Sequence, residues 1–129
     1  MKAIQVEVSP GELIDKLTIL EIKLERITDA AKLKNVRHEH DVLDAVLRQA
    51  VTASAPLAAL HRELRQVNET LWVIEDDIRD LERAKTFDAR FVELARAVYQ
   101  TNDRRAALKR QINDLLHSSI VEEKSYAAY

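Results

Sequence analysis

The chain of 129 residues has no cysteine, one glycine and two prolines. The lack of thiols excludes disulfides, thiolate metal sites and a cysteine nucleophile, and it fits a cytoplasmic protein. A single glycine excludes a glycine-rich phosphate-binding loop. Because few residues break helices and 33% are charged, the composition favours long, solvated helices over a sheet.

Long apolar runs and a strong net charge are also absent. The first eight residues are too polar for a signal peptide, and no segment approaches the roughly 20 apolar residues of a membrane span. The formal net charge of −2 argues against nucleic acid or an anionic membrane as the main partner. We therefore expect a single cytoplasmic domain over residues 1–129, with neither membrane nor nucleic acid among its partners.

Two stretches of the chain repeat apolar residues at alternating spacings of three and four. They are Leu57, Leu60, Leu64, Val67, Leu71, Ile74, Ile78 and Leu81, then Phe87, Phe91, Leu94, Val98, Leu108, Ile112 and Leu115. The second stripe is interrupted only at Thr101 and Arg105. Such stripes are typical of an antiparallel helical hairpin closed along one seam. We predict helices over 56–84 and 87–116 that form a long, coiled-coil-like hairpin, in which facing positions have numbers that add up to about 172.

The first nine residues predict a short strand and a helix cap. Ile4, Val6 and Val8 alternate with polar residues, which is the period of a half-buried strand. A lone strand is unstable, so this one needs the tail of residues 117–129 or a second subunit beside it. The tail could instead fray or dock on the helices. Residues 9–12 predict a helix start, with a capping serine, a proline in the first turn and the glutamate of a capping box.

Two further helices are predicted between the cap and the hairpin. The helix over 10–28 has apolar residues on two faces, because Ile19 and Ile22 point away from its leucine seam. It is therefore central in the fold or part of a subunit interface. An out-of-phase stripe predicts a helix over 30–51, and a single bent helix is the alternative.

The predicted fold is all-α: an antiparallel bundle of three or four helices with a short N-terminal strand. We predict a homodimer, because the first helix has opposed apolar faces and the strand lacks a partner. The candidate interface residues are Ile4, Val6, Val8, Ile19 and Ile22.

The break in the second stripe gathers polar side chains near the middle of the hairpin. One interpretation is a buried polar layer that fixes the register, in which Arg105 pairs with Glu75 or Asp103, or buries its stem and extends its charged head to the surface. The other is a pocket between the first, third and fourth helices, in which Arg105 and Lys109 hold an anionic ligand and Trp72 stacks on it. The candidate ligand-binding residues are Lys16, Glu21, Trp72, Glu75, Asn102, Arg105 and Lys109, and the same band contains Thr18 and Asn68.

The sequence predicts no metal site and no cofactor, and it identifies no catalytic residue. His38 and His40 lack the spacing of three or four that places two ligands on one helix face. Glu75 and Asp76 are adjacent, so they diverge by about 100° on a helix and do not act as a pair. We expect a binding protein more readily than an enzyme.

Four strings of this chain resemble a bacterial family of unknown function. They are SPGELIDKLTILEIK at 9–23, LWxIEDxIR at 71–79, VYxxNDxRA at 98–106 and EEKSY at 122–126. The resemblance covers nearly the whole chain but assigns no activity and no site. It implies an accessory role beside glycosyltransferase-like proteins of surface-polysaccharide pathways. We predict a non-catalytic accessory protein that engages itself or such a partner, and the alternative is a ligand-binding or enzymatic bundle.

Overall fold

The computed structural model describes residues 1–129 and contains four helices and no strand. The helices are α1 (Pro10–Arg26), α2 (Ala30–Ala50), α3 (Ala55–Arg83) and α4 (Ala89–Leu115). Each begins and ends within two residues of the bounds that the sequence predicts. The all-α class is confirmed, and α1 and α2 are separate helices, not one bent helix.

Every helix begins at a capping side chain. The caps are Ser9, Asp29, Ser54 and Asp88, and each accepts a hydrogen bond from the backbone nitrogen three residues further on. These bonds satisfy N–H groups that have no partner within the first helical turn. Pro10 and Pro56 lie in the first turns of α1 and α3, where a missing N–H costs nothing. Local sequence therefore explains where all four helices start.

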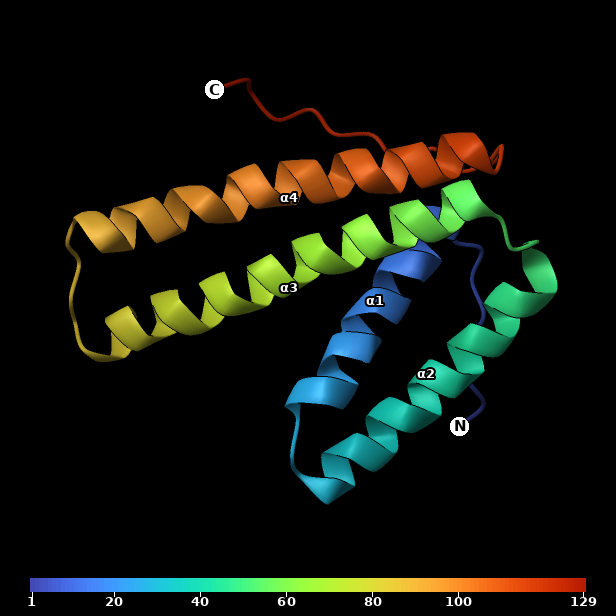
Figure 1. Ribbon diagram of the computed structural model, residues 1–129, viewed down its shortest axis with the longest axis horizontal. Coiled ribbons are helices and arrows are strands. Elements are labelled where there is room, and N and C mark those ends of the chain that lie inside the picture. Colours follow the sequence, from blue (N-terminus) through green and yellow to red (C-terminus); the bar gives the residue numbers. More distant parts are fainter.

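The helices form two hairpins (Figure 1). The long hairpin pairs α3 with α4, and α1 and α2 form a shorter hairpin that runs obliquely to it (Figure 1). In the long hairpin, we call residues 55–69 and 103–115 the proximal half, and residues 70–83 and 89–102 the distal half. Helix α1 packs against all three other helices, so it is central in the fold.

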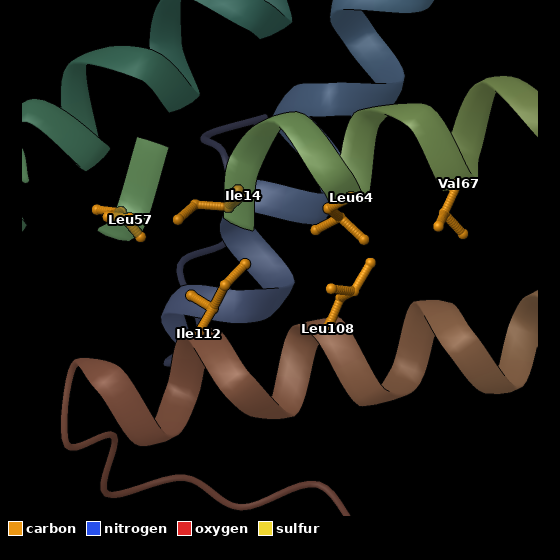
Figure 2. Packing of buried hydrophobic residues seen from close by; sticks show 6 residues of the cluster. All are labelled: Ile14, Leu57, Leu64, Val67, Leu108 and Ile112. Carbon is orange, nitrogen blue, oxygen red and sulfur yellow. The ribbon is translucent and has the colours of Figure 1, made fainter. Parts of the chain in front are cut away.

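An apolar core joins α1 to the proximal half of the long hairpin (Figure 2). Its members are Ile14, Leu57, Leu64, Val67, Leu108 and Ile112. Leu64 and Leu108 point toward one another across α3 and α4, in agreement with the predicted register (Figure 2). Ile14, Leu64 and Ile112 are fully buried, and each such aliphatic side chain contributes about 1.5–3 kcal/mol to folding.

Helix α2 contacts only α1 and contains no buried residue. Its predicted apolar stripe is half-buried against α1, while Val42 and Val46 on its outer side are 50% and 49% exposed. None of the four helices carries an apolar stretch that could cross a lipid bilayer. Helix α2 is therefore an outer layer whose apolar stripe contacts α1 alone.

The predicted N-terminal strand is wrong. Residues 1–8 have no regular secondary structure and are exposed. A strand needs a neighbouring chain that pairs with its backbone. The tail, the candidate partner within the chain, lies along α4 instead (Figure 1).

Candidate functional site

The carboxylate of Asp15 on α1 is the centre of a buried polar cluster. Asp15 is 1% exposed and receives two hydrogen bonds from Arg105 of α4, at 2.9 Å from Nε and 2.5 Å from Nη2. Asn68 of α3 donates a third bond from Nδ2, at 2.9 Å. This two-pronged pairing of a guanidinium with a carboxylate is strong and directional. One buried charge thus joins three helices.

The Thr18 hydroxyl also takes part in the hydrogen bonds around Asn68. The Asn68 Nδ2 donates to Thr18 Oγ1 at 2.8 Å, and the Thr18 hydroxyl donates to the backbone oxygen of Asp15 at 2.7 Å. Thr18 is fully buried and Asn68 is 5% exposed. In the low dielectric of the interior such bonds strengthen one another, and an unsatisfied member would be costly.

The only glycine of the chain lies where α1 meets α4. The backbone nitrogen of Gly11 donates to Asn113 Oδ1 at 2.7 Å. A Cβ atom on Gly11 would lie 2.5 Å from the backbone oxygen of Lys109 and 2.7 Å from Asn113 Oδ1. Both distances are shorter than van der Waals contact, so any larger residue would push the two helices apart. The start of α1 therefore requires glycine for packing.

Lys109 links the start of α1 to the tail. Its Nζ lies 2.6 Å from Glu12 Oε2 and 3.3 Å from Glu122 Oε2. The Ser9 hydroxyl donates to the other Glu122 oxygen at 2.8 Å. The sequence predicts that Glu12 completes a capping box, but its carboxylate binds Lys109 because the ammonium lies within reach across the α1–α4 contact.

The two cations of the cluster hold their protons firmly. The hydrogen bond to Asp15 raises the pKa of Arg105 above its ordinary value, against the opposing effect of burial. Burial would lower the pKa of Lys109, but the Glu12 hydrogen bond and the charges of Glu12, Glu122 and Asp15 outweigh it and raise the pKa. Neither residue is suited to accept a proton near neutral pH, as a general base must.

Every buried side-chain nitrogen or oxygen in the protein has a hydrogen-bond partner. The cluster is therefore satisfied by the chain itself, and its chemistry is that of a polar layer which fixes the helices relative to one another. The predicted partners of Arg105 are wrong: Glu75 pairs with Arg79, and Asp103 contacts the tail. The true partner is Asp15, whose signal in the sequence is a carboxylate set between the apolar residues Ile14 and Leu17.

The structure brings together only three of the seven candidate ligand-binding residues. Asn102, Arg105 and Lys109 line one groove along α4. Lys16 is exposed on α1, and Trp72 is half-buried on α3.

Glu21 and Glu75 take part in separate ion pairs. Glu21 lies 3.1 Å from His61 Nε2 and 4.0 Å from Arg65. Glu75 pairs with Arg79 on the exposed surface of α3 at 3.1 Å. The residues that sequence reasoning did not place in the site are Glu12, Asp15, Asn113 and Glu122.

The candidate interface residues differ in how far their side chains are exposed. Ile22 is 1% exposed and packs inside the fold, because the second apolar face of α1 is covered by other helices of the same chain. Ile19 is half-buried. Ile4, Val6 and Val8 are 78%, 73% and 44% exposed.

The chain has no three His, Asp or Glu side chains placed to hold a metal ion. In comparisons with known proteins, the model of a family of unknown function (DUF6165) matches residues 4–129. No curated protein and no solved structure matches the chain.

Proposed function

We propose that this chain, which belongs to a family of unknown function, is a homo-oligomeric, non-catalytic interaction protein. The observation that carries this proposal is the exposed area. A compact monomer of 14.8 kDa exposes about 7,000 Å², whereas this chain exposes 9189 Å². The exposed residues 1–8 and 121–129 contribute to this difference of about 2,200 Å², and one subunit of an obligate homodimer buries an area of the same order.

The distal half of the long hairpin is the part that most needs a partner. Its seam residues Ile78, Leu81 and Phe91 are only half-buried, and Phe87 at the turn is 58% exposed. Two helices alone leave both flanks of their common seam open to water, and helical bundles close those flanks with further helices. A second copy would supply them.

A groove opens on this half beside the end of α1. It has a volume of about 550 Å³, an apolar floor that includes Val73 and Leu94, and a charged rim that includes Arg26, Arg90, Glu69 and Glu93. Val73 is 44% exposed. A twofold dimer needs a patch that complements itself, and an apolar floor with charges of both signs meets that requirement. We infer that the occupant is the same half of a second copy.

The polar cluster supports the non-catalytic part of the proposal. The Asp15 carboxylate accepts three hydrogen bonds from donors of the chain itself, and the cations Arg105 and Lys109 keep their protons. A role beside a glycosyltransferase-like partner stays a prediction of the family resemblance.

Sedimentation velocity at micromolar concentrations tests the self-association. We expect a dimer for the wild type and a monomer for Val73→Glu, because the substitution places a charge on the floor of the groove. Val46→Glu is the matched control, since Val46 is 49% exposed on α2 and lies outside this groove. A wild type that stays monomeric, or a Val46→Glu variant that loses the dimer while Val73→Glu keeps it, would contradict the proposal.

A further inference from the structure

The tail contacts the rest of the protein mainly through its charged and aromatic side chains. It has no regular secondary structure and lies along α4 (Figure 1). The carboxylate of Glu122 is held by the Ser9 hydroxyl at 2.8 Å and by Lys109 Nζ at 3.3 Å. Glu123 lies 3.7 Å from Arg110. Two adjacent carboxylates thus meet two basic residues and a hydroxyl.

Aromatic rings hold the far end of the tail. The rings of Tyr99 and Tyr129 meet edge to face with centroids 5.1 Å apart. The Tyr129 hydroxyl donates to Asp103 at 2.6 Å, and Lys124 contacts the same carboxylate at 3.4 Å. This outer surface of α4, together with Ser9, recognises a short extended segment by acidic groups at one end and an aromatic group at the other.

The contacts are weak enough to be displaced. The side chains of Glu122 and Glu123 are 47% and 75% exposed, and their partners Lys109 and Arg110 are 16% and 51% exposed. Ion pairs so open to water contribute little to stability. The tail is therefore a loosely held occupant of this surface.

The tail also leaves space beneath it. A groove of about 1010 Å³ lies between the tail and α4, lined by Tyr99, Asn102 and Arg105 on the helix and by Tyr126 and Tyr129 on the tail. A segment with larger side chains would keep the contacts of the tail and fill the groove as well. Filling it would bury apolar and aromatic surface that the tail leaves open to water.

We propose that this α4 groove binds an extended acidic segment of another protein, and that the tail occupies the groove until that segment displaces it. The segment carries adjacent carboxylates for Ser9, Lys109 and Arg110 and an aromatic side chain for Tyr99. The tail of a second copy fits less well, because it has the same side chains as the tail of the chain itself and would leave the same space in the groove unfilled.

A synthetic peptide with the sequence of residues 118–129 is the probe, labelled with a fluorophore. Its binding is measured by fluorescence anisotropy against the full-length wild type and against a full-length variant with Glu122→Gln, Glu123→Gln and Tyr129→Ala. We expect at least tenfold tighter binding to the variant, because in the wild type the tethered tail competes at a millimolar effective concentration. Equal affinity for the two proteins, or no binding to a variant whose circular dichroism is unchanged, would overturn the proposal.

Two arginines provide the matched test of the groove. In the variant with Glu122→Gln, Glu123→Gln and Tyr129→Ala, Arg110→Glu is expected to lower peptide affinity about fivefold, because an exposed attraction becomes a repulsion. A peptide with Glu123→Lys is expected to recover that affinity. Arg104→Glu makes the same charge change at an exposed position outside the groove and is expected to leave affinity unchanged. If both arginine variants act alike, the groove is not the binding site.

The oligomeric state of the wild type and of the variants in solution distinguishes peptide binding in the α4 groove from self-association. A dimer that is lost when the tail is weakened but kept in Val73→Glu would mean that the tail of a second copy fills the groove, and it would overturn the choice of another protein. A monomeric wild type would contradict the proposed hairpin dimer but not the α4 groove, which the peptide measurements test independently.

Discussion

The two halves of the long hairpin carry the same apolar pattern but differ in burial. Leu64 and Ile112 of the proximal half are fully buried, whereas Leu81 and Phe91 of the distal half are half-exposed. The distal half is not open throughout: its seam residues Ile74 and Leu94 are buried, and they line a groove together with Arg26 at the end of α1. The exposed part of the seam is the part toward the turn, to which α1 does not extend (Figure 1). An apolar stripe shows that two helices share a seam, but the number of helices that close it depends on the rest of the fold.

The halves also differ in polar content. The proximal half contains Asn68 and Arg105, which together bind the single carboxylate of Asp15. The distal seam has one polar residue, Thr101, and no charged or amide side chain. A polar layer therefore marks where α1 must dock, since in any other position the buried charge would lose its partners.

The largest expected effect is a contrast between matched substitutions in the two halves. Leu64→Ala creates a cavity at a fully buried position and is expected to cost about 3–5 kcal/mol of unfolding free energy. Leu81→Ala removes a half-buried side chain and is expected to cost about 1 kcal/mol in the monomer. Urea denaturation measures both.

Protein concentration sharpens the same contrast. If a second copy covers the distal half, the cost of Leu81→Ala grows as concentration rises, because the substitution then also weakens the dimer. The cost of Leu64→Ala is expected to rise less, since its cavity lies inside one chain. If Leu64→Ala and Leu81→Ala lowered the free energy of unfolding equally at low concentration, the two halves would not differ in burial.

The next effect concerns the charge that anchors α1. Asp15→Ala leaves Arg105 partly buried and Asn68 short of an acceptor, and it is expected to cost about 3 kcal/mol. The Arg105 side chain is 30% exposed, and water reaches it, so the cost should fall below that of a fully enclosed pair.

Two controls isolate that buried charge. The double variant Asp15→Leu with Arg105→Leu is expected to recover most of the loss, because apolar groups then replace the unpaired ion. Glu75→Ala, which breaks the exposed pair with Arg79, is expected to change stability by less than about 0.5 kcal/mol. A double variant as unstable as the single one would argue against an unpaired charge as the cause.

The helices could be predicted from the sequence because the information is local. Apolar spacing fixes the helical faces, and the capping residues fix the starts. The α3–α4 register could also be predicted, as the opposition of Leu64 and Leu108 shows (Figure 2).

The rest depends on how α1 and the tail meet the long hairpin. The partner of Arg105 was mispredicted because the register of two helices says nothing about a third that crosses them. The same limit applies to Gly11, whose packing role exists only against α4. The predicted strand is wrong because an alternating pattern specifies one face of a strand and not the chain that pairs with it.

The smallest expected effect is a pH dependence that belongs to the proximal half alone. The folded protein raises the pKa of Lys109 above its ordinary value of 10.5. The ammonium therefore stabilises the fold fully below pH 10.5, and this contribution is lost as pH rises through the higher pKa of the folded state. Because Lys109 is partly open to water, we expect a loss of no more than about 1 kcal/mol.

Lys109→Arg is the matched variant for this loss. Arginine keeps its charge throughout this range, so the variant is expected to lose less stability than the wild type in thermal unfolding between neutral pH and pH 11. Tyr129, whose pKa the hydrogen bond to Asp103 raises, loses its contribution in the same direction in both proteins, and the comparison cancels it. Identical alkaline losses would mean that the Glu12–Lys109 contact contributes nothing to holding α1 on α4, and that the apolar core and Asp15 alone distinguish the proximal half from the distal one.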